Sequence, residues 1–161
     1  MTIRKADKEK DLDGIWEIFS NVIKTADTYV FGPDTPKESL TRLWFADSMD
    51  TFVAIDDGSI VGAYFIKPNQ IDLGSHIANC GYMVSPKHQG RGIGQQMCEH
   101  SIAWARAKGY TGIQFNIVVS TNVNAVELWK KFGFEIIGTT PKGFRHKELG
   151  FVDTYIMFKT L

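Results

Sequence analysis

Residues 87–94 read KHQGRGIG and place three glycines just before a segment with the apolar spacing of a helix. Glycine at this density indicates a sharp turn or a close approach of the backbone to a ligand. The first turn of a helix also carries backbone N–H groups without partners and the positive end of the helix dipole. These residues therefore predict an anion site, most naturally for a phosphate or pyrophosphate. The alternative is that Gly90, Gly92 and Gly94 only allow tight packing of helix on sheet.

Two nucleotide-binding motifs do not fit this stretch. A dinucleotide-binding turn needs GxGxxG and an acidic residue about 20 positions later, whereas here the glycines run GxGxG and residues 110–120 contain no Asp or Glu. The phosphate-binding loop of nucleoside triphosphatases needs GxxxxGK followed by Ser or Thr, and the chain contains no such string. Both motifs are excluded, and the general anion site remains.

The cysteines and histidines have no spacing typical of a metal or redox site. Cys80 and Cys98 lie inside apolar segments, so we expect reduced core residues rather than a CxxC pair or a zinc knuckle. His76, His88 and His100 share no ligand spacing, and the string HExxH does not occur. We therefore expect no metal.

Composition limits the class of protein. A chain of 161 residues with 43% hydrophobic content predicts a single domain over residues 1–161. Eighteen basic and eighteen acidic side chains leave no net charge, which argues against nucleic acid or an anionic membrane as partner. The N-terminus has no apolar signal core, and no stretch approaches the roughly 18 apolar residues of a membrane span. We expect a cytoplasmic protein with a small or specifically docked partner.

The apolar patterns that must position these residues alternate between strand and helix, which predicts one continuous α/β layer structure. Thr35, Pro36 and Glu38 have the spacing of a helix start, with Thr35 as the capping residue. We expect strands at residues 2–5, 51–55, 60–66, 76–84, 113–119, 134–138 and 151–158, and helices over residues 12–23, from 35 to 44, from the glycines to Lys108, and within 120–133.

The residues around the glycines resemble a known family. Residues 89–94, QGRGIG, are similar to the Q/R-x-x-G-x-G/A signature of the GNAT superfamily of N-acetyltransferases, and an apolar strand with V-x-P precedes them. Residues 122–134 match the N-x-x-A-x-x-L-Y/W-x-x-x-G-F segment of many members. The resemblance implies an α/β fold with a mixed, mostly antiparallel sheet, a splayed pair of central strands and helices on both faces.

The resemblance also implies acetyl-coenzyme A as acetyl donor. Its pantetheine arm would run beside Met83 and Val84, and Asn122 would hydrogen-bond the cofactor, unless it is only a helix N-cap. Arg91, Lys87 or Lys130 would meet the phosphates, unless each is a solvated surface cation. The pyrophosphate would rest on the backbone amides of Gln89, Gly90, Arg91, Gly92, Ile93 and Gly94.

Acyl transfer to an amine needs a neutral nucleophile, a stabilised oxyanion and a proton for the leaving thiolate. A strand N–H near Met83 or Val84 would stabilise the oxyanion. This chain has Trp129 where many members carry a tyrosine, and Asn79 where many carry a glutamate. Asparagine is no base, but it can hold a water, so Asn79 is a candidate for the catalytic site.

His146, in the segment GFRHKELG, is a second catalytic candidate because the histidine pKa suits proton transfer near neutrality. Its alternative is an exposed loop residue. Tyr82 and Tyr155 lie on or beside central strands and stay open as replacements for the missing groups. A concerted reaction through ordered water also stays open.

Tyr29 and Phe31, together with the segment VDTYIMF, are similar in layout to the branch that acetylates phosphinothricin or methionine sulfoximine. This likeness implies a small, amino-acid-like primary amine as acceptor, bound by Tyr29 and Phe31, unless these rings only anchor their loop. Two functions follow: a working acetyltransferase, or a catalytically weak or inactive acyl-coenzyme A-binding module. A homodimer is left open.

Overall fold

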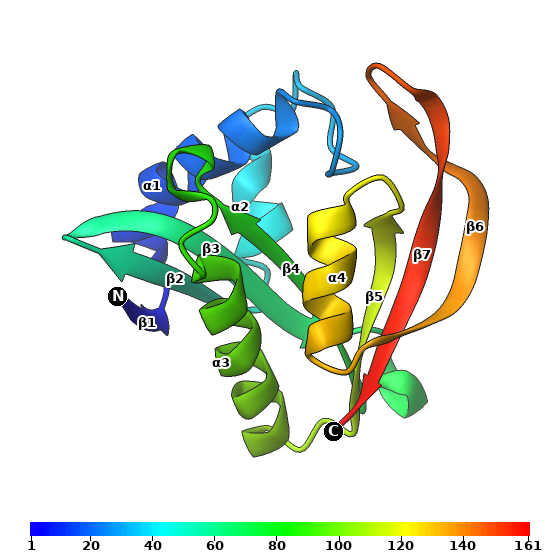
Figure 1. Cartoon of the computed structure of the whole chain (residues 1–161). Helices are drawn as coiled ribbons and strands as arrows, with labels where there is room; N and C mark the ends of the chain where they lie inside the picture. Colours follow the sequence, from blue (N-terminus) through cyan, green and yellow to red (C-terminus); the bar gives the residue numbers. More distant parts are fainter.

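The computed structural model describes residues 1–161 as one seven-stranded sheet with helices on both faces (Figure 1). The strand order is β1-β2-β3-β4-β5-β7-β6, and every neighbouring pair is antiparallel except β4 and β5. This confirms the expected mixed, mostly antiparallel α/β fold. The elements are β1 (Thr2–Lys5), α1 (Lys8–Ile23), α2 (Ser39–Trp44), β2 (Asp50–Asp56), β3 (Ser59–Pro68), η1 (Asp72–Gly74), β4 (Ile77–Val84), η2 (Pro86–His88), α3 (Ile93–Ala107), β5 (Gly112–Val119), α4 (Val123–Lys131), β6 (Glu135–His146) and β7 (Gly150–Thr160).

Strands β4 and β5 are paired only where they begin, Ile77 with Gly112 and Ala78 with Ile113. Beyond these residues β4 stays paired with β3, and β5 stays paired with β7. The two central strands therefore separate, and the backbone groups that face the gap have no strand partner. The expected splayed pair is confirmed, and it creates the space in which the candidate site lies.

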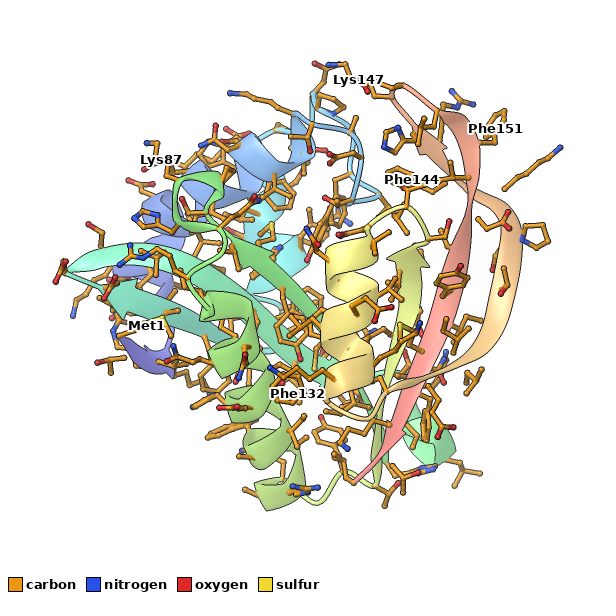
Figure 2. All side chains as sticks on the ribbon, viewed as in Figure 1. Met1, Lys87, Phe132, Phe144, Lys147 and Phe151 are labelled. Atoms are coloured by element: carbon orange, nitrogen blue, oxygen red, sulfur yellow. The ribbon has the colours of Figure 1, made fainter.

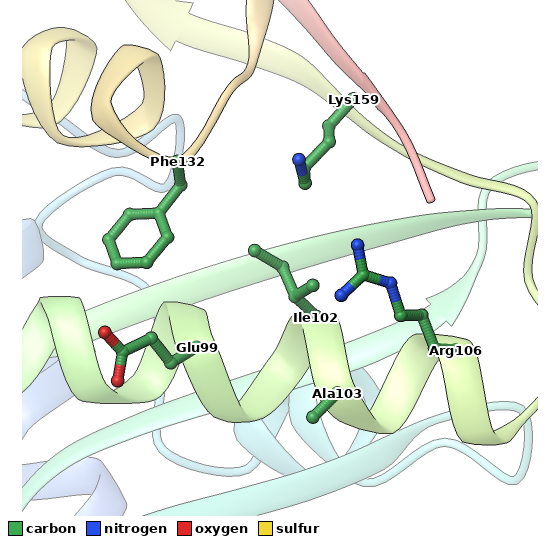
Figure 3. Close-up of a pocket in the computed structure, with 6 residues that line it drawn as sticks. All are labelled: Glu99, Ile102, Ala103, Arg106, Phe132 and Lys159. Atoms are coloured by element: carbon green, nitrogen blue, oxygen red, sulfur yellow. The ribbon is translucent and has the colours of Figure 1, made fainter.

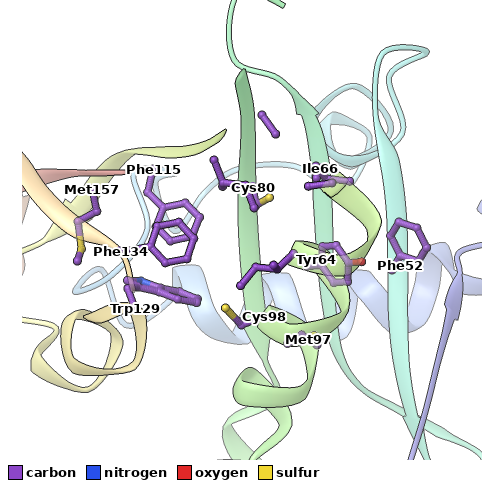
Figure 4. Close-up of a cluster of buried hydrophobic side chains, with 14 of the residues drawn as sticks. Phe52, Tyr64, Ile66, Cys80, Met97, Cys98, Phe115, Trp129, Phe134 and Met157 are labelled. Carbon is purple, nitrogen blue, oxygen red and sulfur yellow. The ribbon is translucent and has the colours of Figure 1, made fainter. Parts of the chain in front are cut away.

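Each face of the sheet has its own hydrophobic core because side chains alternate along a strand. On the face covered by α3 and α4, Cys98 of α3 and Cys80 of β4 belong to one buried cluster (Figure 4). On the face covered by α1 and α2, Phe19 of α1 and Met83 of β4 belong to another. Both cysteines are free and buried, as the sequence predicted.

The second helix begins later than the sequence predicted. Helix α2 starts at Ser39, Glu38 is its N-cap, and no side chain caps it. The Thr35 hydroxyl donates to the carbonyl of Gly32 at 2.7 Å, and its oxygen accepts no N–H from the helix. The residues between form tight turns, in which Ser39 N donates to Pro36 O. The predicted start at Thr35 is wrong, although Leu40 and Trp44 are fully buried as expected.

The last two strands are longer than predicted and form one hairpin. β6 runs on to His146, which pairs with Gly150, so the segment expected to be a loop is mostly strand. An irregular register between Thr140 and Phe144 lets the hairpin bend while the Phe144 side chain stays buried. Lys147, at the tip, donates its N–H to the carbonyl of Ala26, so the hairpin reaches the loop after α1 (Figure 2).

Candidate active site

A cleft of about 770 Å³ lies at the splay between β4 and β5. The glycine-rich turn and α4 line one part of it, and the loop after α1, together with α2 and the end of β3, lines another. The structure brings nearly all of the sequence-predicted site residues to this cleft: Tyr29, Phe31, Asn79, Met83, Val84, Gln89, Gly90, Gly92, Ile93, Gly94 and Asn122. Arg91 and His146 do not line it.

Two of the three glycines in the glycine-rich turn have a backbone conformation that requires glycine. Gly90 and Gly92 have φ angles of +76° and +75°, which residues with a side chain rarely adopt. Gly94 has an ordinary helical position, but a Cβ there would lie 3.4 Å from Leu128 Cδ2 of α4. Since 3.4 Å is an ordinary van der Waals contact, packing does not require a glycine at position 94, and Gly90 and Gly92 have no atom near a Cβ. The alternative that the three glycines only allow tight packing is therefore not supported.

The turn presents a row of unpaired backbone donors. The first hydrogen bond of α3 runs from Gln96 N to Gly92 O at 3.1 Å, and Gly92, the N-cap, has no side chain to accept from the first turn. No backbone N–H between Gln89 and Gln95 has an acceptor within the chain. Since these donors lie at the positive end of the helix dipole, the turn is suited to hold an anion.

The three cations considered for the phosphates are engaged elsewhere. Arg91 pairs with Asp56 at 2.9 Å, Lys87 with Glu17 at 3.4 Å, and Lys130 with Glu127 at 3.1 Å. None of the three lines the cleft. The anion site is therefore built from backbone amides.

Alternation along β4 decides which of its backbone groups face the cleft. Ser85 N donates to Val61 O in the β3 ladder. In an antiparallel pair the hydrogen-bonded residues alternate, so the Met83 amide also points to β3, whereas those of Tyr82 and Val84 point to β5. The Tyr82 carbonyl indeed meets a group in the gap, because it accepts from the Tyr29 hydroxyl at 3.0 Å.

Asn79 lies where the two strands part. Its Nδ2 donates to the carbonyl of Gln114 on β5 at 2.9 Å, one residue beyond the last paired position. The side chain thus replaces a missing ladder bond and leaves its Oδ1 free of bonds to the chain. Asn122 accepts from Ala125 N at 3.4 Å, so it caps α4 as the simpler interpretation held, and it also lines the cleft.

Trp129 closes the cleft with an aromatic cluster. Its ring lies 4.8 Å from that of Phe115 (Figure 4). It lies 4.9 Å from the ring of Tyr82, and only 8% of the residue is exposed. The indole N–H donates to no group of the chain. Trp129 therefore acts in this structure as a packing residue.

The alternative proton carriers are placed away from the reacting region. The Tyr82 hydroxyl is hydrogen-bonded to Ser101 Oγ of α3 at 2.7 Å, and burial raises its pKa well above the ordinary value. Tyr155 does not line the cleft. His146 Nδ1 accepts from the amides of Glu148 and Leu149 at 3.1 and 3.2 Å, so this nitrogen holds the hairpin turn together. The structure does not bring His146 to the cleft.

The opposite part of the cleft is aromatic. The rings of Tyr29 and Phe31 lie 6.1 Å apart, and Phe31 packs on Phe19 of α1 at 5.4 Å, so the loop is anchored and exposed to the cleft at once. Burial raises the pKa of Tyr29. Gly81 was missed by sequence reasoning: a Cβ there would lie 2.6 Å from Phe65 and 3.2 Å from the Tyr29 oxygen. The sequence signal for this close approach was a glycine inside a predicted strand.

A second, smaller hollow of about 290 Å³ lies along the C-terminal half of α3 (Figure 3). It shares no lining residue with the cleft and contains no sequence-predicted site residue. No group of three or more His, Cys, Asp or Glu side chains comes together as a metal site, and no helix has the length and hydropathy needed to cross a membrane.

Comparison with known proteins places this cleft in a family. A model of the acetyltransferase (GNAT) family matches residues 16–134, which include β4, the glycine-rich turn and α4. The chain belongs to the GNAT family.

Two curated relatives of this GNAT chain are named N-acetyltransferases. It is 37% identical over 99 residues to N-acetyltransferase aca1 of Schizosaccharomyces pombe, a match covering 61% of this chain and 47% of that protein. It is 34% identical over 121 residues to L-amino acid N-acetyltransferase AaaT of Escherichia coli, covering 72% and 71%. The matched region thus spans about half the length of the first relative.

Solved structures share the GNAT fold over nearly the whole chain. A GCN5-related N-acetyltransferase from Kribbella flavida has a TM-score of 0.94 at 36% identity, covering 99% of this chain and 97% of that one. Two more share the fold at lower identity: YncA of Salmonella typhimurium, solved with acetyl-coenzyme A (TM-score 0.88, 22% identity, covering 100% and 94%), and a putative phosphinothricin N-acetyltransferase (TM-score 0.89, 18% identity, covering 99% and 98%).

Proposed function

We propose that this GNAT chain transfers the acetyl group of acetyl-coenzyme A to the primary amine of a small, amino-acid-like acceptor. The observation that carries the proposal is one continuous cleft with unpaired amides at the glycine-rich turn, free backbone groups of β4 in the middle and aromatic side chains beyond them. The family, the acetyl-coenzyme A bound to the YncA structure and the amino-acid acceptor in the name of AaaT support it.

The cofactor would bind mainly through backbone groups. Its pyrophosphate would accept hydrogen bonds from the amides of residues 89–95, where the helix dipole also favours negative charge. Its pantetheine arm would lie in the gap beside β4 and pair with the free groups of Tyr82 and Val84. The Tyr29 hydroxyl would then exchange its bond to the Tyr82 carbonyl for one to the cofactor or the acceptor.

Acyl transfer would proceed through a tetrahedral intermediate. The neutral amine attacks the thioester carbon, and a β4 amide, that of Val84 or Tyr82, donates to the carbonyl oxygen as it becomes negative. The intermediate collapses with cleavage of the C–S bond, so the amide forms and the coenzyme thiolate leaves. The amine proton passes to water held at Asn79 Oδ1, because no Asp or Glu lines the cleft. The thiolate takes its proton from solvent.

The second candidate function is an acyl-coenzyme A-binding module with little or no catalysis. The observation that favours it is the absence of a carboxylate from the cleft, together with the packed Trp129. Such a module would keep the backbone anion site but would not release the coenzyme thiol.

One experiment separates the two functions. The purified chain is titrated with acetyl-coenzyme A by calorimetry, and thiol release is then followed with a panel of small amines, with mass spectrometry of the acetylated product. Acetylated amine formed in step with free thiol supports the transferase. Tight binding without product from any amine supports the module, and failure to bind acetyl-coenzyme A contradicts both functions.

A further inference from the structure

Two cationic side chains line the cleft without an ionic partner. Arg42 lies on α2 and Lys67 at the end of β3, and neither takes part in an ion pair or a side-chain hydrogen bond. No Asp or Glu lines the cleft, so nothing on its walls neutralises them. Lys87, Arg91 and Lys130, in contrast, are each paired with a carboxylate.

Strand register places Lys67 on the acceptor side. Lys67 lies directly opposite Asn79, and Phe65 opposite Gly81, so these four side-chain positions share one face of the sheet. That face is the one covered by α1 and α2, since Phe65 packs edge-on against Trp44 of α2. Arg42 belongs to the same short helix.

The Lys67 ammonium group extends back along β3 toward the reacting region. Its Nζ lies 5.9 Å from the centre of the Phe65 ring, which holds the charge over an aromatic face. Phe65 is opposite Gly81, and Gly81 is one residue from Tyr82, whose carbonyl faces the gap. The Lys67 charge is therefore held at the position on β3 that pairs with Gly81, the neighbour of Tyr82 on β4.

We propose that Arg42 and Lys67 form a subsite for the carboxylate of the acceptor, so that the chain selects amines that carry a carboxylate. The inference rests on the proposed transferase function and adds to it the residues that choose the substrate. An arginine guanidinium and a lysine ammonium can both form charge-assisted hydrogen bonds with carboxylate oxygens. These bonds offset the cost of removing the two cations from water better than bonds to a neutral group would. The same charges repel polyamines and basic peptide tails, because a second ammonium group would lie beside them.

The test compares amino acids with their carboxamides, which have the same size and no negative charge. Glycine, L-leucine and L-methionine are each paired with the corresponding amide, and thiol release gives kcat and KM for every member. The amine of a carboxamide is less basic, so more of it is neutral at a given pH. Any preference for the acid therefore arises from recognition of the carboxylate and not from a larger fraction of neutral amine.

Arg42→Gln and Lys67→Gln are measured beside two control variants, Arg106→Gln and Lys8→Gln, which remove exposed cations outside the cleft. We expect wild type and controls to prefer each acid over its amide by about tenfold or more, the effect of one charge-assisted hydrogen bond. Each of the Arg42 and Lys67 variants should lower that preference through a raised KM for the acid, with kcat and the amide kinetics unchanged.

The remaining outcomes distinguish the two proposals. If wild type turns over acids and amides equally, or if the variants lower both equally, the carboxylate subsite is overturned and the transferase function stands. If acetyl-coenzyme A binds and no amine of either kind releases thiol, the transferase function is overturned, and the subsite with it. An unchanged melting temperature and acetyl-coenzyme A shift confirm that each variant is folded.

Discussion

Three side chains at positions considered for catalysis have structural roles instead. Trp129 packs between aromatic rings, Asn79 bridges the parting strands, and His146 caps a hairpin turn. In the proposed mechanism, the chemistry is therefore left to backbone donors, to solvent and to the positioning of the two substrates, which alone can supply a large part of an acyl-transfer rate.

Trp129→Phe should cost little in the chemical step, because it removes an N–H that bonds to no group of the chain and some packing area. Trp129→Tyr should keep or raise turnover, since a phenol in this place would be able to protonate the leaving thiolate. General acid catalysis typically raises the rate of such a step by about 10² to 10⁴. Single-turnover rates at saturating acetyl-coenzyme A measure both effects. A loss of about hundredfold or more in folded Trp129→Phe, the scale of a catalytic proton donor, would contradict the packing role.

Gly81→Ala should narrow the acceptor part of the cleft. The added Cβ would lie 2.6 Å from Phe65 and 3.2 Å from the Tyr29 oxygen, so both rings must move. Overpacking of this kind typically costs about 1 to 3 kcal/mol. We expect a raised KM for the amine and a lower melting temperature, with acetyl-coenzyme A binding retained.

Gly32→Ala is the matched control for Gly81→Ala, because a Cβ at Gly32 has no atom within 4 Å. Steady-state kinetics and melting curves of the two variants are compared. Equal KM values for the amine in Gly81→Ala and Gly32→Ala would show that Gly81 does not shape the acceptor site.

At the scale of elements, the anion site is a property of one strand-turn-helix unit. Strand β4 ends at Val84, the chain turns through two glycines with positive φ, and α3 begins without a side-chain cap. A helix start normally has its free amides satisfied by a capping residue or by water. The missing cap leaves these donors available to a ligand.

Gly92→Asp should abolish most of the stabilisation by acetyl-coenzyme A, because it sets a carboxylate against the bound pyrophosphate. A ligand at 100 times its Kd adds about 2.7 kcal/mol to the free energy of unfolding. Gly92→Asn is the control, since asparagine has the same size and the same strain at φ +75° without the charge. Thermal shifts at fixed ligand concentration compare the two. If folded Gly92→Asp kept the full thermal shift with acetyl-coenzyme A, the anion would not bind at this turn.

At the scale of the whole molecule, the sheet carries two independent cores, and the splay lies between them. A partly buried ion pair helps to fasten α1 to the sheet edge: Arg4 of β1 donates to both oxygens of Asp11 at 2.7 and 2.8 Å, and Asp7 N donates as well. Asp11 is only 4% exposed. The bond from Arg4, more than that from Asp7, keeps the pKa of Asp11 below its usual value.

This ion pair predicts a loss of stability in acid. A carboxylate whose pKa is lowered by folding stabilises the protein above its unfolded pKa of about 3.9, and that contribution disappears as the pH falls through the lower folded pKa. Asp11→Asn should be less stable at pH 7 by about 1 to 2 kcal/mol, since Arg4 is partly exposed and solvent weakens the pair. Its melting temperature should also fall less between pH 5 and pH 3 than that of wild type. If the melting temperatures of the two proteins fell in parallel as the pH is lowered, Asp11 would not be the source of the acid sensitivity.

Local patterns were enough to predict much of this molecule. The order of strands and helices, the buried cysteines and the glycine-rich turn follow from residues near one another in the chain, because side-chain periodicity and backbone freedom act locally. The hairpin turn at Asp57 and Gly58, both with positive φ, was predictable for the same reason.

What tertiary structure decided is which distant residues meet. Lys67 comes beside Asn79 only through strand register, Gly81 beside Tyr29 only because a loop folds over β4, and the sequence does not identify the partner in either pair. The helix start at Ser39 and the long last hairpin also depend on bonds made elsewhere. The cleft itself exists because β4 and β5 pair with different neighbours beyond their first residues. Each strand could pair with several others, and which of these non-local pairings forms depends on the packing of the whole fold.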